Sequence, residues 1–329
     1  MTRRAISAVL LLASTLIPAT ALAQEERAQP SPRIALVLSG GAAKGFAHVG
    51  VIKVLEEMRV PVHLVTATSM GSIIGGLYAS GTSADEIEEI ISTVDWNGLF
   101  TDAPPREDLD FRRKEDDSKY LFAQGLGIRF DRGVVLPRGA LVGQKINLLF
   151  RRETLHLAGI EDFDDFPIPY RAVAADIETG EPFVIDHGDL ATAMRASMSI
   201  PGAFDPVEIE GHLLVDGGVA DNMPVDLARS LGADVVIAVD VSSPMRTRDQ
   251  LGNVLGIVGQ LTSMLSRLNV EEQIPRADIL LDPELGELDG GDYTKAREFV
   301  AVGEAEARRH AAELAQYSVS EAEYAAYRA

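Results

Sequence analysis

Ser69 lies where a serine could act as a nucleophile. It follows the β-branched run Val65–Thr68 and precedes "MGSIIGGLYASG", a small-residue segment typical of a helix. Ligands of open α/β sheets bind at the carboxyl edge of the sheet, where such a strand ends. Ala67 and Gly71, two residues before and after Ser69, allow the tight turn of a nucleophile elbow, although glycine is usual at both positions. The pattern alone also permits the simpler interpretation that Ser69 caps the helix.

A glycine-containing loop precedes this segment by one β-α unit. "SGGAAKG", Ser39 to Gly45, joins the apolar strand "RIALVL" to a helical segment, an arrangement that directs backbone N–H groups at an anion. A dinucleotide-binding loop would need glycine where Ala42 stands. A phosphate-binding P-loop would end in G-K followed by serine or threonine, whereas Gly45 is followed by Phe46 and Ala47. The loop therefore favours an oxyanion hole that serves Ser69.

Asp216 is the best-placed base for such a nucleophile. It ends the apolar run "HLLV" and precedes Gly217 and Gly218, which places it on a tight turn at a strand end. An Asp-Gly pair is also common in purely structural turns. We expect the histidines to be surface or core residues outside any triad; they are His48, His63, His156, His187, His212 and His310. The sequence contains neither H-E-x-x-H nor a calcium-loop pattern, so neither a metal nor a cofactor is expected.

Composition narrows the classes of partner. The 329 residues include 46% apolar residues, enough for a substantial core, and no cysteine, which excludes disulfides and a thiolate nucleophile. The formal net charge of −20 argues against nucleic-acid binding, because phosphate contacts need lysine and arginine. It also argues against electrostatic docking on anionic lipid, so any membrane contact would have to be mainly apolar.

The order of elements indicates an α/β protein. Strands over 33–41 and 60–68 alternate with helices over 43–58 and 70–80, which predicts parallel strands covered by helices. The charged stretch 95–139 breaks the pattern and is expected to be a solvated excursion. Farther along, the sequence predicts two strands joined near Thr179-Gly180, a hairpin turning at Glu210-Gly211 and a buried strand over 233–242.

An amphipathic helix is expected between Gln250 and Leu268. Its apolar residues form one stripe at helical spacing: Leu251, Val254, Leu255, Val258, Leu261, Leu265 and Leu268. Two interpretations remain open, since periodicity does not identify what an apolar face contacts. The helix could cover the sheet, or it could be an interfacial or lid helix.

The N-terminus has the pattern of a cleaved export signal. Arg3 and Arg4 precede a short apolar run that contains Pro18, and "ALA" ends at Ala23. A polar, proline-containing linker follows over 24–32. We therefore expect the mature chain to work outside the cytoplasm, in the periplasm, as a secreted protein or in association with an outer membrane.

These three motifs, in this order, resemble those of the patatin-like phospholipase family, and the export signal resembles its exported bacterial branch. The matching segments are Gly40-Gly41-Ala42-Ala43-Lys44-Gly45, Ala67-Thr68-Ser69-Met70-Gly71 and Asp216-Gly217-Gly218. The resemblance covers roughly 33–243. It implies a three-layer α/β/α fold with a mostly parallel central sheet. It also implies a Ser69–Asp216 dyad without histidine, an oxyanion hole at Gly40, Gly41 and Ala42, and a basic residue at Lys44. Ala42 and Ala67 replace glycines that are usual in the family.

The resemblance implies a lipid acyl hydrolase of the phospholipase A type that acts on glycerophospholipid esters. Two other functions remain open: a soluble short-acyl esterase or thioesterase that uses the same dyad, and an inactive lipid-binding module. The expected organisation is an export signal over 1–23, a linker over 24–32, a patatin-like domain over 33–315 and a tail over 316–329.

Overall fold

The computed structural model describes residues 32–101, 127–129, 133–135, 139, 141–242, 245, 247–252 and 254–328. The expected export signal over 1–23, most of the linker after it and most of the charged excursion over 95–139 lie outside these residues.

An eight-stranded sheet organises the fold, with β10, β9, β1, β2, β5, β8 and β7 in that order and β6 paired to β5. The first five of these strands pair in parallel, whereas β6, β7 and β8 pair antiparallel. Their bounds are β1 Ile34–Leu38, β2 Leu64–Thr68, β5 Tyr170–Asp176, β6 Pro182–Ile185, β7 Val207–Ile209, β8 His212–Asp216, β9 Val235–Val239 and β10 Ile279–Leu281. A separate antiparallel pair joins β3 Gly127–Arg129 to β4 Gly133–Val135.

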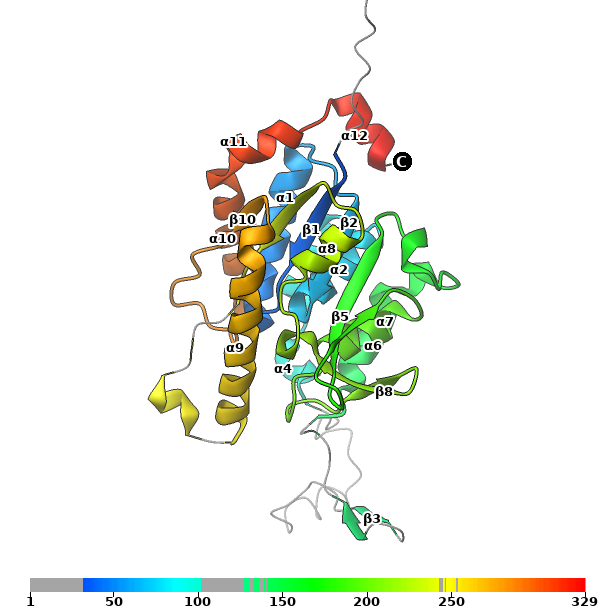
Figure 1. The fold of residues 1–329 in the computed structure, drawn as a ribbon, viewed down its shortest axis with the longest axis vertical. Helices are drawn as coiled ribbons and strands as arrows, with labels where there is room; N and C mark the ends of the chain where they lie inside the picture. The colour runs from blue at the N-terminus through cyan, green and yellow to red at the C-terminus, as the bar shows by residue number, and fades with distance from the viewer. Residues whose placement is uncertain are drawn as a thin grey trace, which may run out of the picture. The chain divides into compact units, whose positions relative to one another are not determined.

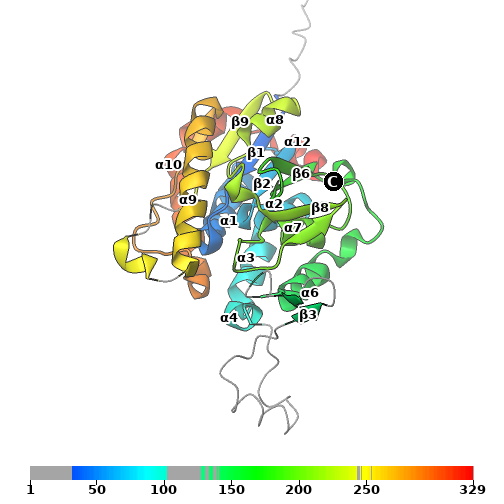
Figure 2. The same ribbon diagram turned by 60° about the horizontal axis from the view of Figure 1, so that its bottom comes forward.

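Helices cover both faces of the sheet (Figures 1 and 2). One face carries α8 and α9, and the other carries α1, α2, α3, α7 and α10. The helix bounds are α1 Ala47–Glu57, α2 Met70–Ala79, α3 Ala84–Thr93, α4 Trp96–Leu99, α6 Gln144–Glu153, α7 Leu190–Ser197, α8 Val225–Ser230, α9 Val254–Gln273, α10 Ala296–Arg309, α11 Ala311–Leu314 and α12 Glu321–Arg328. This confirms the expected three-layer α/β/α fold with a mostly parallel sheet.

The central strand β1 explains why both faces need cover. All five of its residues are buried. Ile34, Leu36 and Leu38 pack into the larger cluster, and Ala35 and Val37 pack against the α8 side. Successive side chains of a strand point to opposite faces, so a continuous apolar run fits only between two helical layers.

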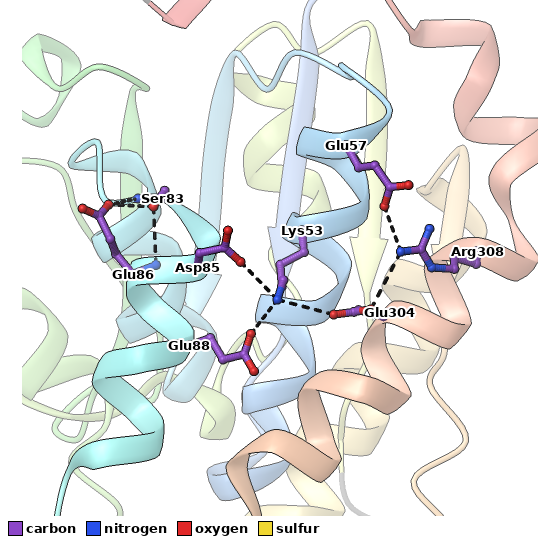
Figure 3. Close-up of polar contacts among 8 residues, drawn as sticks. All are labelled: Lys53, Glu57, Ser83, Asp85, Glu86, Glu88, Glu304 and Arg308. Carbon is purple, nitrogen blue, oxygen red and sulfur yellow. Dashed lines mark hydrogen bonds and ion pairs between the residues drawn. The ribbon is translucent and has the colours of Figure 1, made fainter.

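Helices α1, α3 and α10 are joined by close packing and by charge. A Cβ atom at Gly303 of α10 would lie 1.9 Å from the Ala47 carbonyl oxygen, so the α1 and α10 backbones are almost in contact. Lys53 of α1 pairs with Asp85 at 3.1 Å, Glu88 at 2.6 Å and Glu304 at 3.6 Å (Figure 3). Single, partly exposed pairs of this kind contribute only about 0–1 kcal/mol each, so close packing is the main contact between these helices.

Helix α9 differs from the helix expected between 250 and 268. It begins at Val254 and extends to Gln273, and a separate short turn spans Arg248–Leu251. Much of the apolar stripe faces outward, because Leu261, Leu265 and Leu268 are 54%, 46% and 65% exposed. Val270, near the C-terminal end of α9, packs against the sheet. Covering the sheet is therefore the role of only part of the helix.

The last helix, α12, packs against the residues just before β2. The Tyr327 hydroxyl donates to the Val62 carbonyl oxygen at 2.8 Å and accepts from the Val62 N–H at 3.2 Å. Within the described residues, none of the helices has the length and apolar character needed to cross a membrane.

Candidate active site

The carboxyl ends of β2 and β8 meet along one side of β5. Ala172 and Val173 pair with β2 on one side and with β6 on the other, and Ala174 and Ala175 pair with β8 on one side and with β6 on the other. Strands β2 and β8 therefore share the side of β5 opposite β6. Thr68 ends β2 beside Val173, and Asp216 ends β8 beside Ala174. The register alone brings Asp216 to the residue that follows Thr68, which is Ser69.

The backbone at Ser69 has the conformation of a strained elbow. Its φ of 54° and ψ of −122° are unusual for a residue with a side chain, and such strain costs about 1–3 kcal/mol. The Ser197 hydroxyl accepts the Ser69 N–H at 2.9 Å and donates to the Val173 carbonyl oxygen at 2.6 Å. Ser197 thus holds the turn that presents the Ser69 hydroxyl at the N-terminal end of α2. Strain maintained in this way is typical of a nucleophile elbow.

Ser69 and Asp216 form a direct hydrogen bond. The Ser69 hydroxyl donates to Asp216 Oδ2 at 2.6 Å, and the Gly218 N–H donates to Asp216 Oδ1 at 2.8 Å. Both side chains are buried. Burial raises the pKa of Asp216 to about 6, and the two hydrogen bonds oppose that rise. A carboxylate with a pKa close to neutrality is suited to accept a proton and to return it.

Close backbone approaches explain the glycines of these motifs. A Cβ atom at Gly71 would lie 2.4 Å from the Leu38 carbonyl oxygen, and one at Gly217 would lie 2.2 Å from the Val173 carbonyl oxygen. Ala67 stands where a nucleophile elbow usually has glycine, and Gly75 of α2 makes room for its methyl group. A Cβ atom at Gly75 would lie 3.3 Å from that methyl group. Gly75 therefore leaves the space that the extra methyl group of the elbow occupies.

The glycine-containing loop lies beside Ser69, and its three residues differ in their hydrogen bonds. The Gly40 N–H already donates to the Asn222 carbonyl oxygen at 3.2 Å, so Gly40 shapes the loop but does not offer a donor. Gly41 and Ala42 line the same cavity as Ser69. Ala42 adopts a φ of 52°, a left-handed conformation that explains why glycine is usual there. The candidate oxyanion donors are thus narrowed to the N–H groups of Gly41 and Ala42.

Lys44 and Gly45 support the loop from behind. The Lys44 side chain is buried, and burial lowers its pKa while the charge of Asp289 opposes this effect. A Cβ atom at Gly45 would lie 2.4 Å from Met70 Cγ, so the loop packs directly on the first residue of α2. Gly45 therefore allows the loop and the start of α2 to pack closely together.

A cavity of about 130 Å³ opens onto the dyad. One wall is α9, which contributes small or hydroxylated residues at helical spacing: Gly259, Thr262, Ser263 and Ser266. Asn222 also lines the cavity, and its side-chain amide donates to the Gly40 carbonyl oxygen at 3.2 Å. Sequence reasoning missed Asn222, Ser197 and this wall. The small-residue spacing within 259–266 was a signal that could have revealed the wall.

The histidines have other partners. His48 Nε2 lies 2.8 Å from the Ser39 carbonyl oxygen, and burial lowers the His48 pKa to about 4, so the ring is neutral at physiological pH. His212 starts β8 and bonds to Asp176 at 2.7 Å. Within the described part of the chain, which includes all six histidines, none is hydrogen-bonded to Ser69 or Asp216.

The sequence of this chain matches the family that its motifs resemble, over most of the strands of the sheet. The family model of patatin-like phospholipases matches residues 36–229, more than half of the chain. Patatin-like phospholipase domain-containing protein 6 of Mus musculus is 36% identical over 217 residues, which are 65% of this chain and 14% of that protein. An NTE family protein of Mycobacterium bovis is 32% identical over 216 residues, 66% of this chain and 51% of that protein. The matched region is thus about half or less of each of these relatives.

Two solved structures are also similar. VipD of Legionella pneumophila has a TM-score of 0.47 at 16% identity, over 87% of this chain and 67% of that chain. ExoU of Pseudomonas aeruginosa, in complex with SpcU, has a TM-score of 0.42 at 16% identity, over 87% of this chain and 52% of that chain. On the sequence match over residues 36–229, this chain belongs to the patatin-like phospholipase family.

Proposed function

We propose that this protein is a serine hydrolase that cleaves acyl esters of glycerophospholipids, with an activity of the phospholipase A type. The observation that carries this proposal is the 2.6 Å hydrogen bond from the Ser69 hydroxyl to Asp216 Oδ2. A hydroxyl that already donates to a buried carboxylate is ready to lose its proton as it attacks a carbonyl carbon. Membership of the patatin-like phospholipase family supports a lipid ester as the substrate.

In the first half of the reaction, the Ser69 oxygen attacks the ester carbonyl carbon and its proton passes to Asp216. The carbonyl oxygen becomes an oxyanion that faces the N–H groups of Gly41 and Ala42. When the tetrahedral intermediate collapses, the bond to the leaving alcohol breaks. Asp216 returns the proton to the alcohol oxygen, and the acyl group remains on Ser69. One well-placed oxyanion donor typically contributes about 10²–10³ in rate.

In the second half, water replaces the alcohol. Asp216 accepts a proton from this water as its oxygen attacks the acyl carbon, and the same loop holds the second oxyanion. The bond to Ser69 then breaks, the proton returns to the Ser69 oxygen, and a fatty acid leaves. The dyad alone moves the proton in every step, and it is restored at the end of the cycle.

The lipid surface is proposed to contact the outer face of α9. Large apolar side chains are exposed there: Ile257, Leu261, Met264, Leu265 and Leu268. No charged residue occurs between 254 and 266, so this part of the face would enter a lipid surface without burying a charge. Leu268 lies at the edge of the face, beside the exposed Arg267. The opposite face of the same helix lines the catalytic cavity, which places the cavity next to the proposed contact.

Export is proposed from the sequence of the first 23 residues, with their arginine pair, apolar run and "ALA" end. Proteolytic processing at Ala23, measured by N-terminal sequencing of the mature protein, tests this proposal. A mature protein that retains Arg3 and Arg4 would contradict it.

The proposed substrate class is tested by comparing phosphatidylcholine vesicles with a soluble short-chain ester under matched conditions. We expect fatty acid release from vesicles that is lost in Ser69→Ala and retained in a distant surface variant such as Glu321→Gln on α12. Activity confined to the soluble ester would instead favour the short-acyl esterase. Lipid binding without release from either substrate would favour an inactive lipid-binding module.

A further inference from the structure

A second cavity, of about 250 Å³, lies beside the catalytic cavity. We name it the apolar cavity. Its walls come from α9, from the end of β5 and from the turn that follows β8. The apolar side chains that shape it are Pro201, Val215, Val219, Val258, Leu261 and Leu265. Its volume exceeds the roughly 150 Å³ of an engineered protein cavity that holds a benzene molecule.

The apolar cavity adjoins the catalytic cavity, with which it shares one lining residue. Thr262 of α9 lines both cavities. Val215 and Val219 line the apolar cavity, whereas Asp216 and Gly218, their respective neighbours in the chain, line the catalytic cavity. The turn that carries the proposed base therefore lines both cavities.

The polar groups at the apolar cavity are already satisfied. Asp176 bonds to His212 at 2.7 Å and accepts the Glu178 N–H at 2.9 Å. The Thr262 hydroxyl donates to the Val258 carbonyl oxygen of its own helix at 3.1 Å. A ligand that enters here gains burial of apolar surface and few hydrogen bonds, which suits a hydrocarbon chain.

We infer that the apolar cavity is the acyl-chain subsite: it holds the hydrocarbon chain of an ester whose carbonyl carbon lies at Ser69. This inference rests on the proposed function. Residues 261 and 265 of α9 then set how much of the chain is buried, and so determine the preference for acyl-chain length. Their partial exposure places the mouth of the subsite on the outer face of α9.

The first test uses soluble p-nitrophenyl esters from acetate to laurate. Leu261→Trp should fill the mouth of the cavity, and Leu261 is exposed enough for the variant to fold. The ratio of kcat/KM for laurate to that for acetate should fall about tenfold, the effect of leaving roughly two methylene groups unburied. Leu155→Trp, a variant at an exposed residue that lines neither cavity and lies outside α9, should leave the ratio unchanged. An unchanged ratio in both Leu261→Trp and Leu265→Trp would overturn the inference, as would equal losses on acetate and laurate.

The second test is independent of turnover. Lauroyl lysophosphatidylcholine, below its micelle concentration, is titrated into Ser69→Ala by calorimetry, with and without Leu261→Trp. We expect Leu261→Trp to weaken binding about tenfold and Leu155→Trp to leave it unchanged. If Leu261→Trp weakens binding but the unmodified protein hydrolyses no ester, the subsite is supported and the proposed function is contradicted. If Leu261→Trp leaves the affinity unchanged, the subsite is contradicted even if esters are hydrolysed.

Discussion

Asn222 holds Gly40 through both the N–H and the carbonyl oxygen of that residue. The Gly40 N–H donates to the Asn222 carbonyl oxygen and the Asn222 side-chain amide donates to the Gly40 carbonyl oxygen, each at 3.2 Å. Asn269 of α9 in turn accepts the Asn222 N–H at 2.9 Å. These contacts fix the peptide groups on both sides of Gly40, the second of which carries the Gly41 N–H, and they link the loop to α9.

Asn222→Ala should therefore lower kcat about tenfold or more, with a smaller change in KM, because misplaced donors lose stabilisation that is specific to the transition state. Asn269→Ala, one contact farther from the loop, is the matched variant and should lose less. Steady-state kinetics on a soluble ester measures both. A change in KM alone for Asn222→Ala would assign Asn222 to substrate binding and not to positioning of the loop.

The neighbouring loop positions Gly41 and Ala42 should respond in opposite ways to a change of side chain. A Cβ atom at Gly41 would lie 2.4 Å from the Val241 carbonyl oxygen, so Gly41→Ala must displace the loop and should lose most of its turnover. Ala42→Gly relieves a left-handed alanine, which should raise the free energy of unfolding by about 1 kcal/mol. Chemical denaturation and kcat report the two effects. Full turnover in Gly41→Ala would exclude the loop from catalysis.

Because the pKa of Asp216 is raised, activity and stability should change in opposite directions as the pH rises. The carboxylate must be ionised to act as a base, so kcat/KM should rise with pH through an acid limb near pH 6. Folding raises the pKa from 3.8 to about 6, so the folded state binds this proton more tightly than the unfolded state does. The stability due to this group is fully present below about pH 3.8 and is lost as the pH rises through about 6.

Asp216→Asn removes that ionisation while keeping the size of the side chain. The variant should be more stable than the unmodified protein at pH 8, by about 2–3 kcal/mol, and the difference should shrink towards pH 4. Its kcat should fall by about 10²–10⁴, the usual contribution of a general base. His48→Gln serves as the control and should retain the acid limb. A stability difference that does not vary with pH would contradict the raised pKa.

Activity on vesicles should depend on exposed side chains that lie outside both cavities. Ile257 and Leu268 are 51% and 65% exposed on α9. Replacing both with Asn should reduce fatty acid release from phosphatidylcholine vesicles at least tenfold, through the loss of buried apolar surface. Release of p-nitrophenol from soluble esters should be unchanged. Equal losses on both substrates would show that these residues stabilise the fold and do not contact lipid.

The sequence predicted the elements that carry Ser69 and Asp216, because buried strands, glycine turns and helix starts are local patterns. How the two residues meet could not be predicted. It depends on β8 pairing antiparallel with β5 just beyond the end of β2, and this register is set by contacts distant in sequence. The hydrogen bond that occupies the Gly40 N–H could not be predicted for a similar reason, since its partner Asn222 lies 182 residues away.

Helix α9 illustrates a different limit. Its apolar stripe is plain in the sequence, and an apolar face usually packs inward. Here part of the inward face is instead the small-residue wall of the catalytic cavity, so several large side chains remain exposed. Periodicity identifies the faces of a helix, but only the fold decides which face meets a cavity.

The most direct test of the central claim is intact-mass analysis after reaction with a fluorophosphonate. The Ser69–Asp216 account predicts one adduct per chain, localised to Ser69 by peptide mapping. It also predicts no adduct in Ser69→Ala and labelling at least a hundredfold slower in Asp216→Asn, in line with the loss of a general base. Persistent stoichiometric labelling of Ser69→Ala, or an undiminished rate in Asp216→Asn, would contradict the account.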